Sequence, residues 1–316
     1  MARQSRRIAG LIAMFATLLG ALPWPPDADD PLATILRAQD EAGLEPLTDG
    51  RPAIAPEDAD AQPVERWMRA RGLTQRAVKV VLVGPYSLSW GGGGSRRLGA
   101  GRLRRAMGAA AWLHDQVLAL AEAGCPLVEI QETEAHRVGL DVMERGLFVD
   151  VHRRLADGVA GIHLSLSLVG GAADAAGVET ILAAPYASLA VDLIAGPDNW
   201  RLVARTPGDR GIVAGVIEPA EGSDDRPELP VWAARYAAST GGRGLTRVGL
   251  GTAGSLGRLP WPVAAEKLRR LGDAARIAGL PPREQADALD PRALDIRTAA
   301  LGRHAPPPPR RQRRRP

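Results

Sequence analysis

Cysteine is nearly absent from this sequence, which contains one, Cys125, in 316 residues. A single thiol excludes an internal disulfide and any metal site built from several cysteines. Such a composition suits a reducing compartment, so a cytoplasmic protein is expected. The apolar run at residues 8–21, IAGLIAMFATLLGA, is shorter than the roughly 20 residues that a membrane-spanning helix needs, and no membrane association is expected.

An excess of positive charge is also missing from most of the chain, although the formal net charge is +4. Six arginines lie within residues 303–316, which contain no acidic residue. Without them the chain has 34 basic and 36 acidic residues, so it offers no basic face for a run of phosphates. No specific nucleic-acid partner is therefore expected, and the proline- and arginine-rich tail, residues 302–316, is predicted to be disordered.

The N-terminus allows two interpretations. Residues 1–7, MARQSRR, and the apolar run after them resemble a secretory signal, with a twin arginine at Arg6 and Arg7. Alternatively, residues 16–22 form the first strand of the fold, which cleavage near Ala21 would destroy. The arrangement of the remaining chain favours the second interpretation, in which residues 1–14 are a short extension.

Short apolar runs alternate with longer amphipathic patterns along the chain, which is typical of a parallel sheet built from βα units. The predicted strands are residues 16–22, 44–48, 78–88, 126–132, 161–169, 188–194, 211–217 and 247–250. The predicted helices are residues 31–42, 101–123, 140–156, 175–182, 199–204, 229–240 and 263–278. Eight continuous apolar strands, covered outside by helices, predict a single (β/α)8 TIM barrel over residues 15–301.

Two glycine-rich segments could suggest an open, nucleotide-binding sheet instead. The segment GLGTAG at residues 249–254 satisfies the dinucleotide pattern, but it comes near the end of the chain and lacks a strand carrying an acidic ribose partner. The run of four glycines at residues 91–94 is better explained as a loop after a strand than as a phosphate-binding loop. Neither segment displaces the barrel prediction.

Seven segments, in order, resemble parts of the C-terminal catalytic barrel of cobalamin-independent methionine synthase, in the superfamily shared with uroporphyrinogen decarboxylase. They are LLGALPWP, AQDEAGLEPLTDGR, VKVVLVGPYSLSW, AEAGCPLVEIQETEA, IHLS, VDLI and GIVAGVIEP, and the match covers about residues 15–280. The resemblance depends on the order of these segments along the chain.

The resemblance implies a zinc ion that activates a substrate thiolate for methyl transfer from a folate. The family holds this ion with a histidine, a cysteine two residues later, a glutamate on the next strand and a second cysteine after the last strand. Here those positions fall on His163, Ser165, Asp192 and Thr252 or Ala253. Two plausible ligands remain, so we expect no bound zinc and no other cofactor.

The amino-acid pocket that the resemblance implies has changed as well. Ala21 stands at a substrate-binding serine position, Trp24 at an arginine, Arg51 at a glutamate, and Thr133 at the aspartate beside Glu134. Homocysteine would therefore lose its main polar contacts, at about 1–3 kcal/mol for each hydrogen bond left unmade. The family's acidic residue on the strand GIVAGVIEP corresponds to Glu218.

Three hypotheses remain open. The first is a diverged transferase-like or lyase-like enzyme acting on a small anionic metabolite. Its candidate acid/base residues are Glu134, His163 and Asp192, and its candidate substrate contacts are Arg51, Trp24, Ser165 and Glu218. The second is a catalytically silent barrel that binds a metabolite or an undetermined protein partner, and the third is a working methionine synthase. Convergence of the candidate residues on one enclosed pocket would favour an enzyme, whereas a mouth plugged by apolar side chains would favour the silent barrel.

Overall fold

Eight parallel strands form the centre of the protein in a computed structural model, which describes residues 14–50, 62–91 and 98–290. The hydrogen-bonded order is β1-β8-β7-β6-β5-β4-β3-β2, so the strands from β2 to β8 follow one another in sequence and β8 also pairs with β1. The strands are β1 (Phe15–Thr17), β2 (Leu47–Thr48), β3 (Val78–Val83), β4 (Leu127–Glu132), β5 (His163–Leu168), β6 (Ser188–Asp192), β7 (Gly211–Ile217) and β8 (Val248–Thr252). The prediction of a (β/α)8 barrel is confirmed.

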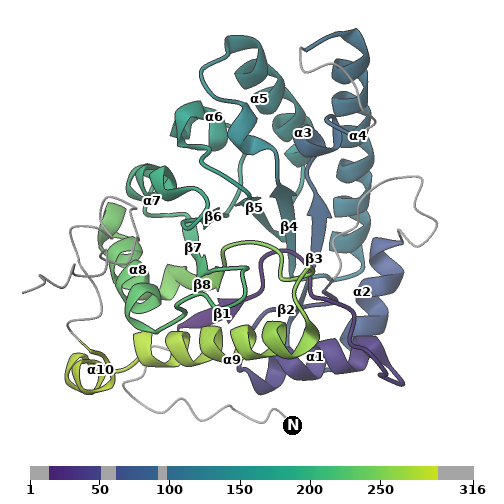
Figure 1. Cartoon of the computed structure of the whole chain (residues 1–316). Helices are drawn as coiled ribbons and strands as arrows, with labels where there is room; N and C mark the ends of the chain where they lie inside the picture. The colour runs from purple at the N-terminus through teal and green to yellow at the C-terminus, as the bar shows by residue number, and fades with distance from the viewer. Residues whose placement is uncertain (1–13, 51–61, 92–97, 291–316) are drawn as a thin grey trace, which may run out of the picture.

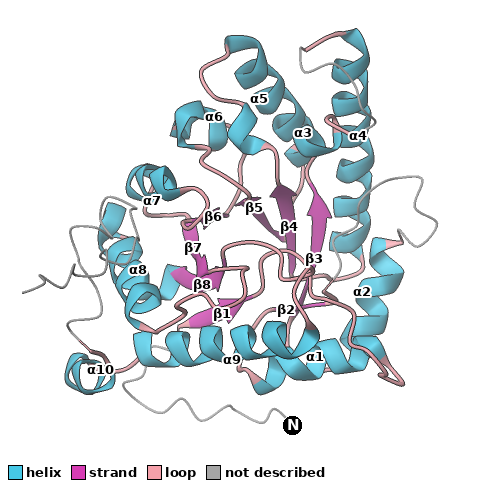
Figure 2. Cartoon of the chain, viewed as in Figure 1, coloured by secondary structure: helices cyan, strands magenta, loops and turns pink. Residues whose placement is uncertain are grey.

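Helices surround this sheet on the outside (Figures 1 and 2). They are α1 (Pro31–Glu41), α2 (Pro63–Gly72), α3 (Pro85–Leu88), α4 (Ala100–Glu122), α5 (Val142–Ala156), α6 (Val178–Ile181), α7 (Trp200–Arg205), α8 (Glu228–Ser239), α9 (Trp261–Ala278) and α10 (Pro282–Ala288), with short 3-10 turns between some of them. None of the described helices is long and apolar enough to cross a bilayer.

The barrel closes between β1 and β2 without a regular ladder. The backbone N–H of Glu45 donates to the carbonyl of Ala16 at 2.8 Å, and the hydroxyl of Thr17 donates to the carbonyl of Pro46 at 2.8 Å. These two bonds connect the edges of the sheet. Since β1 also pairs with β8 from Phe15 to Thr17, residues that begin the described chain are an integral part of the barrel.

The predicted strand at residues 78–88 is wrong in its second half. Strand β3 ends at Val83, and Pro85 opens the short helix α3, because its fixed φ suits the first position of a helix and it has no N–H to donate to a ladder. The helix α2 was not predicted, although Pro63 starts it and Trp67 and Ala70 supply its buried face. The helix α10 was not predicted either.

The barrel interior is partly filled by apolar side chains. Leu19, Val169, Ala190 and Val213 form a buried cluster against which Phe15 packs. The glycines of the segment at residues 249–254 provide the necessary space: a Cβ at Gly249 would overlap the Phe15 ring, and one at Gly251 would lie 2.9 Å from Cγ of Leu19. Close packing therefore explains Gly249 and Gly251, which only resemble part of a dinucleotide-binding motif.

Candidate functional site

The carboxyl ends of the strands are where (β/α)8 enzymes place their chemistry, and Asp192 ends β6 there. Its buried carboxylate accepts backbone N–H groups from Gly170 at 3.2 Å, Ile194 at 2.9 Å and Ala195 at 2.9 Å. Burial raises the pKa of Asp192, although these hydrogen bonds to the carboxylate oppose the shift. The side chain thus holds the loops after β5 and β6 together.

Glu134 lies two residues beyond the end of β4 and forms an ion pair with Arg137. The guanidinium of Arg137 lies 4.6 Å from the centroid of the Trp90 ring, and that of Arg102 lies 3.7 Å from it. The backbone N–H of Glu134 donates to the hydroxyl of Ser87 at 3.0 Å. The charge of Glu134 is therefore compensated by Arg137, within a network of side chains that connects the loops after β3 and β4.

Arg102 is the centre of the buried part of this network. It makes two hydrogen bonds to the carboxylate of Glu144, at 2.6 and 2.8 Å, and the Tyr86 hydroxyl donates to the same carboxylate at 2.8 Å. Burial raises the pKa of Tyr86 above its ordinary value of 10.0. These hydrogen bonds join α3 and α4 to α5, and the charges of Arg102 and Glu144 compensate each other without a ligand.

His163 lies at the opposite end of the barrel, because it is the first residue of β5 and pairs in register with Leu127, the first residue of β4. Its Nε2 is 2.8 Å from the hydroxyl of Ser188, which donates to the hydroxyl of Ser165 at 2.9 Å. The imidazole reaches solvent, yet enough protein surrounds it for desolvation to lower its pKa from the ordinary value. His163 and Ser165 therefore belong together, away from Asp192 and Glu134.

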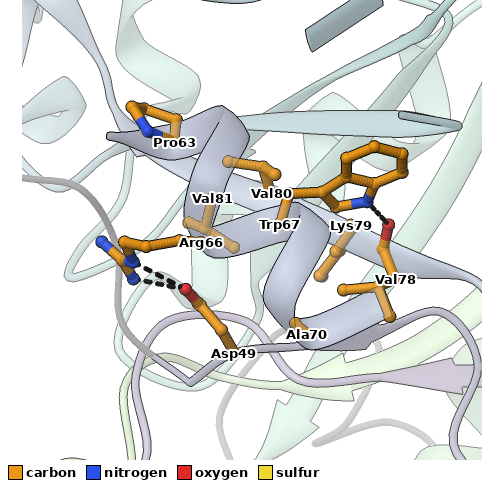
Figure 3. Close-up of a pocket in the computed structure, with 9 residues that line it drawn as sticks. All are labelled: Asp49, Pro63, Arg66, Trp67, Ala70, Val78, Lys79, Val80 and Val81. Carbon is orange, nitrogen blue, oxygen red and sulfur yellow. Dashed lines mark hydrogen bonds and ion pairs between the residues drawn. The ribbon is translucent and has the colours of Figure 1, made fainter. Parts of the chain in front are cut away.

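Two of the remaining predicted substrate contacts follow strands at their carboxyl ends. Trp24 lies in the loop after β1 and is 53% exposed, and Glu218 follows β7 in a half-buried position. Arg51 lies outside the described residues. Nearby, Asp49 after β2 accepts two hydrogen bonds from Arg66 of α2, at 2.9 and 2.5 Å, beside a packing void of about 10 Å³ that is too small for a ligand (Figure 3). The predicted catalytic and substrate residues are thus distributed over both ends of the barrel.

The zinc site implied by the family resemblance does not fit the residues present. His163 and Asp192 occupy opposite strand ends, so one ion cannot bind both. The hydroxyl of Thr252 already donates to the carbonyl of Leu19 at 2.9 Å and accepts its N–H at 3.0 Å. No cluster of three or more His, Cys, Asp or Glu side chains suited to a metal occurs within the described ranges. Cys125 is buried between α4 and β4, where desolvation raises its thiol pKa to about 11.

A cavity of about 470 Å³ opens at the amino ends of the strands. It is lined by Phe15, Thr17, Pro46, Lys79, Leu127, Glu129, His163, Ser165, Ala187, Ser188, Asp209, Gly211, Ile212, Val213, Thr246 and Arg247. Its volume lies in the range of about 300–1,000 Å³ that is usual for small-molecule sites. This cavity therefore lies at the opposite end of the barrel from the carboxyl ends of the strands, where (β/α)8 enzymes place their chemistry.

An ion pair forms the innermost part of this cavity. The ammonium of Lys79 donates to Oε2 of Glu129 at 2.6 Å and to the carbonyl of Leu18 at 2.7 Å, and the two side chains are 1% and 2% exposed. Sequence reasoning missed both residues. The available signal was a charged residue within each of two apolar runs, VKVVLV and LVEIQE, since a charge in a buried strand needs a partner.

Comparison with known proteins supports the fold. No known family profile matches the chain, and no curated protein matches it in sequence. Among solved structures, it is similar to a B12-independent methionine synthase from Shewanella sp. W3-18-1, with 14% identity, a TM-score of 0.69, and coverage of 88% of this chain and 100% of the other. A methyltransferase from Methanosarcina mazei gives 14% identity, a TM-score of 0.56, and coverage of 85% and 94%. D-psicose 3-epimerase from Clostridium cellulolyticum H10 gives 13% identity, a TM-score of 0.50, and coverage of 84% and 99%. The chain thus shares the (β/α)8 barrel fold of methionine synthase-like proteins and of enzymes with different chemistry.

Proposed function

We propose that this chain is a metabolite-binding barrel of the methionine synthase type that has lost zinc-dependent methyl transfer and performs no catalysis at the carboxyl ends of its strands. The observation that carries the proposal is the separation of the candidate acid/base groups. Asp192 accepts three hydrogen bonds from loop amides, Glu134 is paired with Arg137, and His163 lies at the other end of the barrel. A general acid and base must reach one substrate, and His163 cannot meet Asp192 and Glu134 at the carboxyl ends of the strands.

The apolar cluster in the barrel interior gives further support. Leu19 and Val169, just past the ends of β1 and β5, are buried within it together with Val213. Small amino-acid substrates carry charges that need polar partners, and an apolar layer offers none. A homocysteine site of the family type would have to displace this layer.

A transferase-like or lyase-like enzyme acting on a small anionic molecule is the second candidate. It is favoured by the fold likeness to a methyltransferase, at 14% identity. Fold likeness alone does not determine a reaction, because one barrel supports unrelated chemistries. Arg51, which lies outside the described residues, would be its anion-binding residue.

Two measurements on the purified full-length chain test the proposal. The protein is denatured, and the released small molecules are identified by mass spectrometry against an unrelated barrel protein purified in parallel. We expect one metabolite enriched in proportion to the chain. Transfer of a labelled methyl group from a methylated folate to homocysteine is then measured with and without added zinc, and no transfer is expected. Zinc-stimulated transfer, or the absence of any retained or bound metabolite, would contradict the proposal.

A further inference from the structure

The cavity at the amino ends of the strands combines buried polar groups with an open rim. Lys79, Glu129, Ser165 and Ser188 are buried on its inner wall, whereas His163 and Arg247 are exposed at its entrance. From this geometry we infer that the cavity binds an uncharged polyhydroxylated molecule, such as a sugar or a cyclic polyol, through Glu129 and Ser165. The inference rests on the proposed function that this barrel binds a metabolite, and it specifies the place and the chemical class.

Glu129 gives the first indication of a ligand. One carboxylate oxygen, Oε2, accepts from Lys79, while the other, Oε1, is buried and has no hydrogen-bond partner among the residues that the structure describes. A buried acceptor without a partner costs about 1–3 kcal/mol, and more when it is charged. Because Glu129 lines the cavity, a hydroxyl group that enters it could donate to Oε1 and remove this cost.

Ser165 gives the second indication, because it lies beside Glu129 in the register of β4 and β5. The hydroxyl of Ser188 donates its hydrogen to Ser165, so the Nε2 of His163 acts as the donor to Ser188. The hydrogen of the Ser165 hydroxyl then remains available. A ligand hydroxyl between Ser165 and Glu129 would accept from the serine and donate to the carboxylate, which is the pattern that an alcohol satisfies.

The charges of the cavity balance, which argues for a neutral ligand. Lys79 and Glu129 neutralise each other inside, and Asp209 and Arg247 contribute one charge of each sign at the entrance. An anion would face the carboxylate of Glu129, and a cation would face the ammonium of Lys79. A neutral ligand avoids both penalties, since burying an unpaired charge is expensive.

Apolar side chains complete the site. Phe15, Leu127, Ile212 and Val213 line the same cavity as the polar groups. Their surfaces suit the C–H faces of a ring whose edges carry hydroxyl groups. A mostly apolar wall with a few placed polar groups is the usual composition of a small-molecule site.

The test is binding of myo-inositol, D-glucose and D-ribose to the full-length protein by isothermal titration calorimetry. D-gluconate, D-glucosamine and D-glucose 6-phosphate serve as charged analogues of similar size. We expect at least one neutral compound to bind, and the charged analogues to bind at least tenfold more weakly. Stronger binding of a charged analogue, or no binding of any of the neutral compounds, would overturn the inference.

Variants locate the site. Ser165→Ala removes the proposed donor, and Ala187→Trp fills the entrance at an exposed position that lines the cavity. Each should weaken binding at least tenfold. Ser167→Ala is the matched control, since Ser167 is on the same strand outside the cavity lining and its hydroxyl bonds to no other described residue. Equal affinity of all three variants and the parent would show that the ligand binds elsewhere, in which case the proposed function stands and this inference fails.

Discussion

Replacement of Glu129 by glutamine tests how the barrel accommodates its innermost charges. The substitution keeps the side-chain volume but leaves the ammonium of Lys79, which is 1% exposed, without the carboxylate that lies 2.6 Å from it. Removing one partner of a buried ion pair costs about 3–5 kcal/mol, because the other charge stays buried and uncompensated. We therefore expect Glu129→Gln to lower the free energy of unfolding by that amount.

A double-mutant cycle measured by urea unfolding separates this effect from loss of packing. Lys79→Met removes the cation while filling most of its space, and the combination with Glu129→Gln should recover at least about half of the single-variant loss, since no lone charge remains. Unfolding free energies of both single variants within about 1 kcal/mol of the parent would refute the reasoning, because loss of a solvent-exposed ion pair costs no more than that.

Three further outcomes follow from the structure. Gly249→Ala should destabilise the protein by about 1–3 kcal/mol in urea unfolding, because its Cβ overlaps the Phe15 ring, and Phe15→Leu should restore much of the loss; equal stability of Gly249→Ala and the parent would contradict the packing. Burial lowers the pKa of His163 below 6.5, so on acidification the histidine is protonated at a higher pH in the unfolded chain than in the folded one. The parent should therefore lose stability as the pH falls from 6.5 to the lowered pKa of the folded state. His163→Gln should lack this pH-dependent loss of stability, and identical pH profiles of the two proteins would contradict the reasoning. The thiol of Cys125, with its pKa raised to about 11, should react with a thiol reagent only after denaturation, and rapid labelling of the folded protein would contradict its burial.

The barrel could be predicted from the sequence because its strands are continuous apolar runs separated by amphipathic helices. The ends of strands and helices were predicted incorrectly where polar and apolar residues are mixed. Residues 84–88 look apolar enough for a strand, but Pro85 begins a helix there. In α2, whose buried residues are Pro63, Trp67 and Ala70, several arginines masked the amphipathic pattern.

The candidate site was harder to predict, because which side chains of a barrel lie close together depends on the register of neighbouring strands. The family resemblance assigned His163 to the carboxyl-end site, although the predicted strand at residues 161–169 by itself places this residue near the amino end. Conversely, Lys79 and Glu129 are 50 residues apart and meet only because β3 and β4 are adjacent. Nothing in the sequence specifies that register, so the cavity they line emerged from the structure alone.

The loss of the metal site is tested most directly by the zinc content of the full-length protein after dialysis against a weak chelator. We expect only traces of zinc, because Ser165 and Thr252 or Ala253 stand where the family that the sequence resembles has its thiolates and because His163 and Asp192 lie at opposite strand ends. Inductively coupled plasma mass spectrometry gives the ratio of metal to chain. One tightly held zinc ion per chain would contradict this expectation, since it would require a set of ligands that these strands do not bring together.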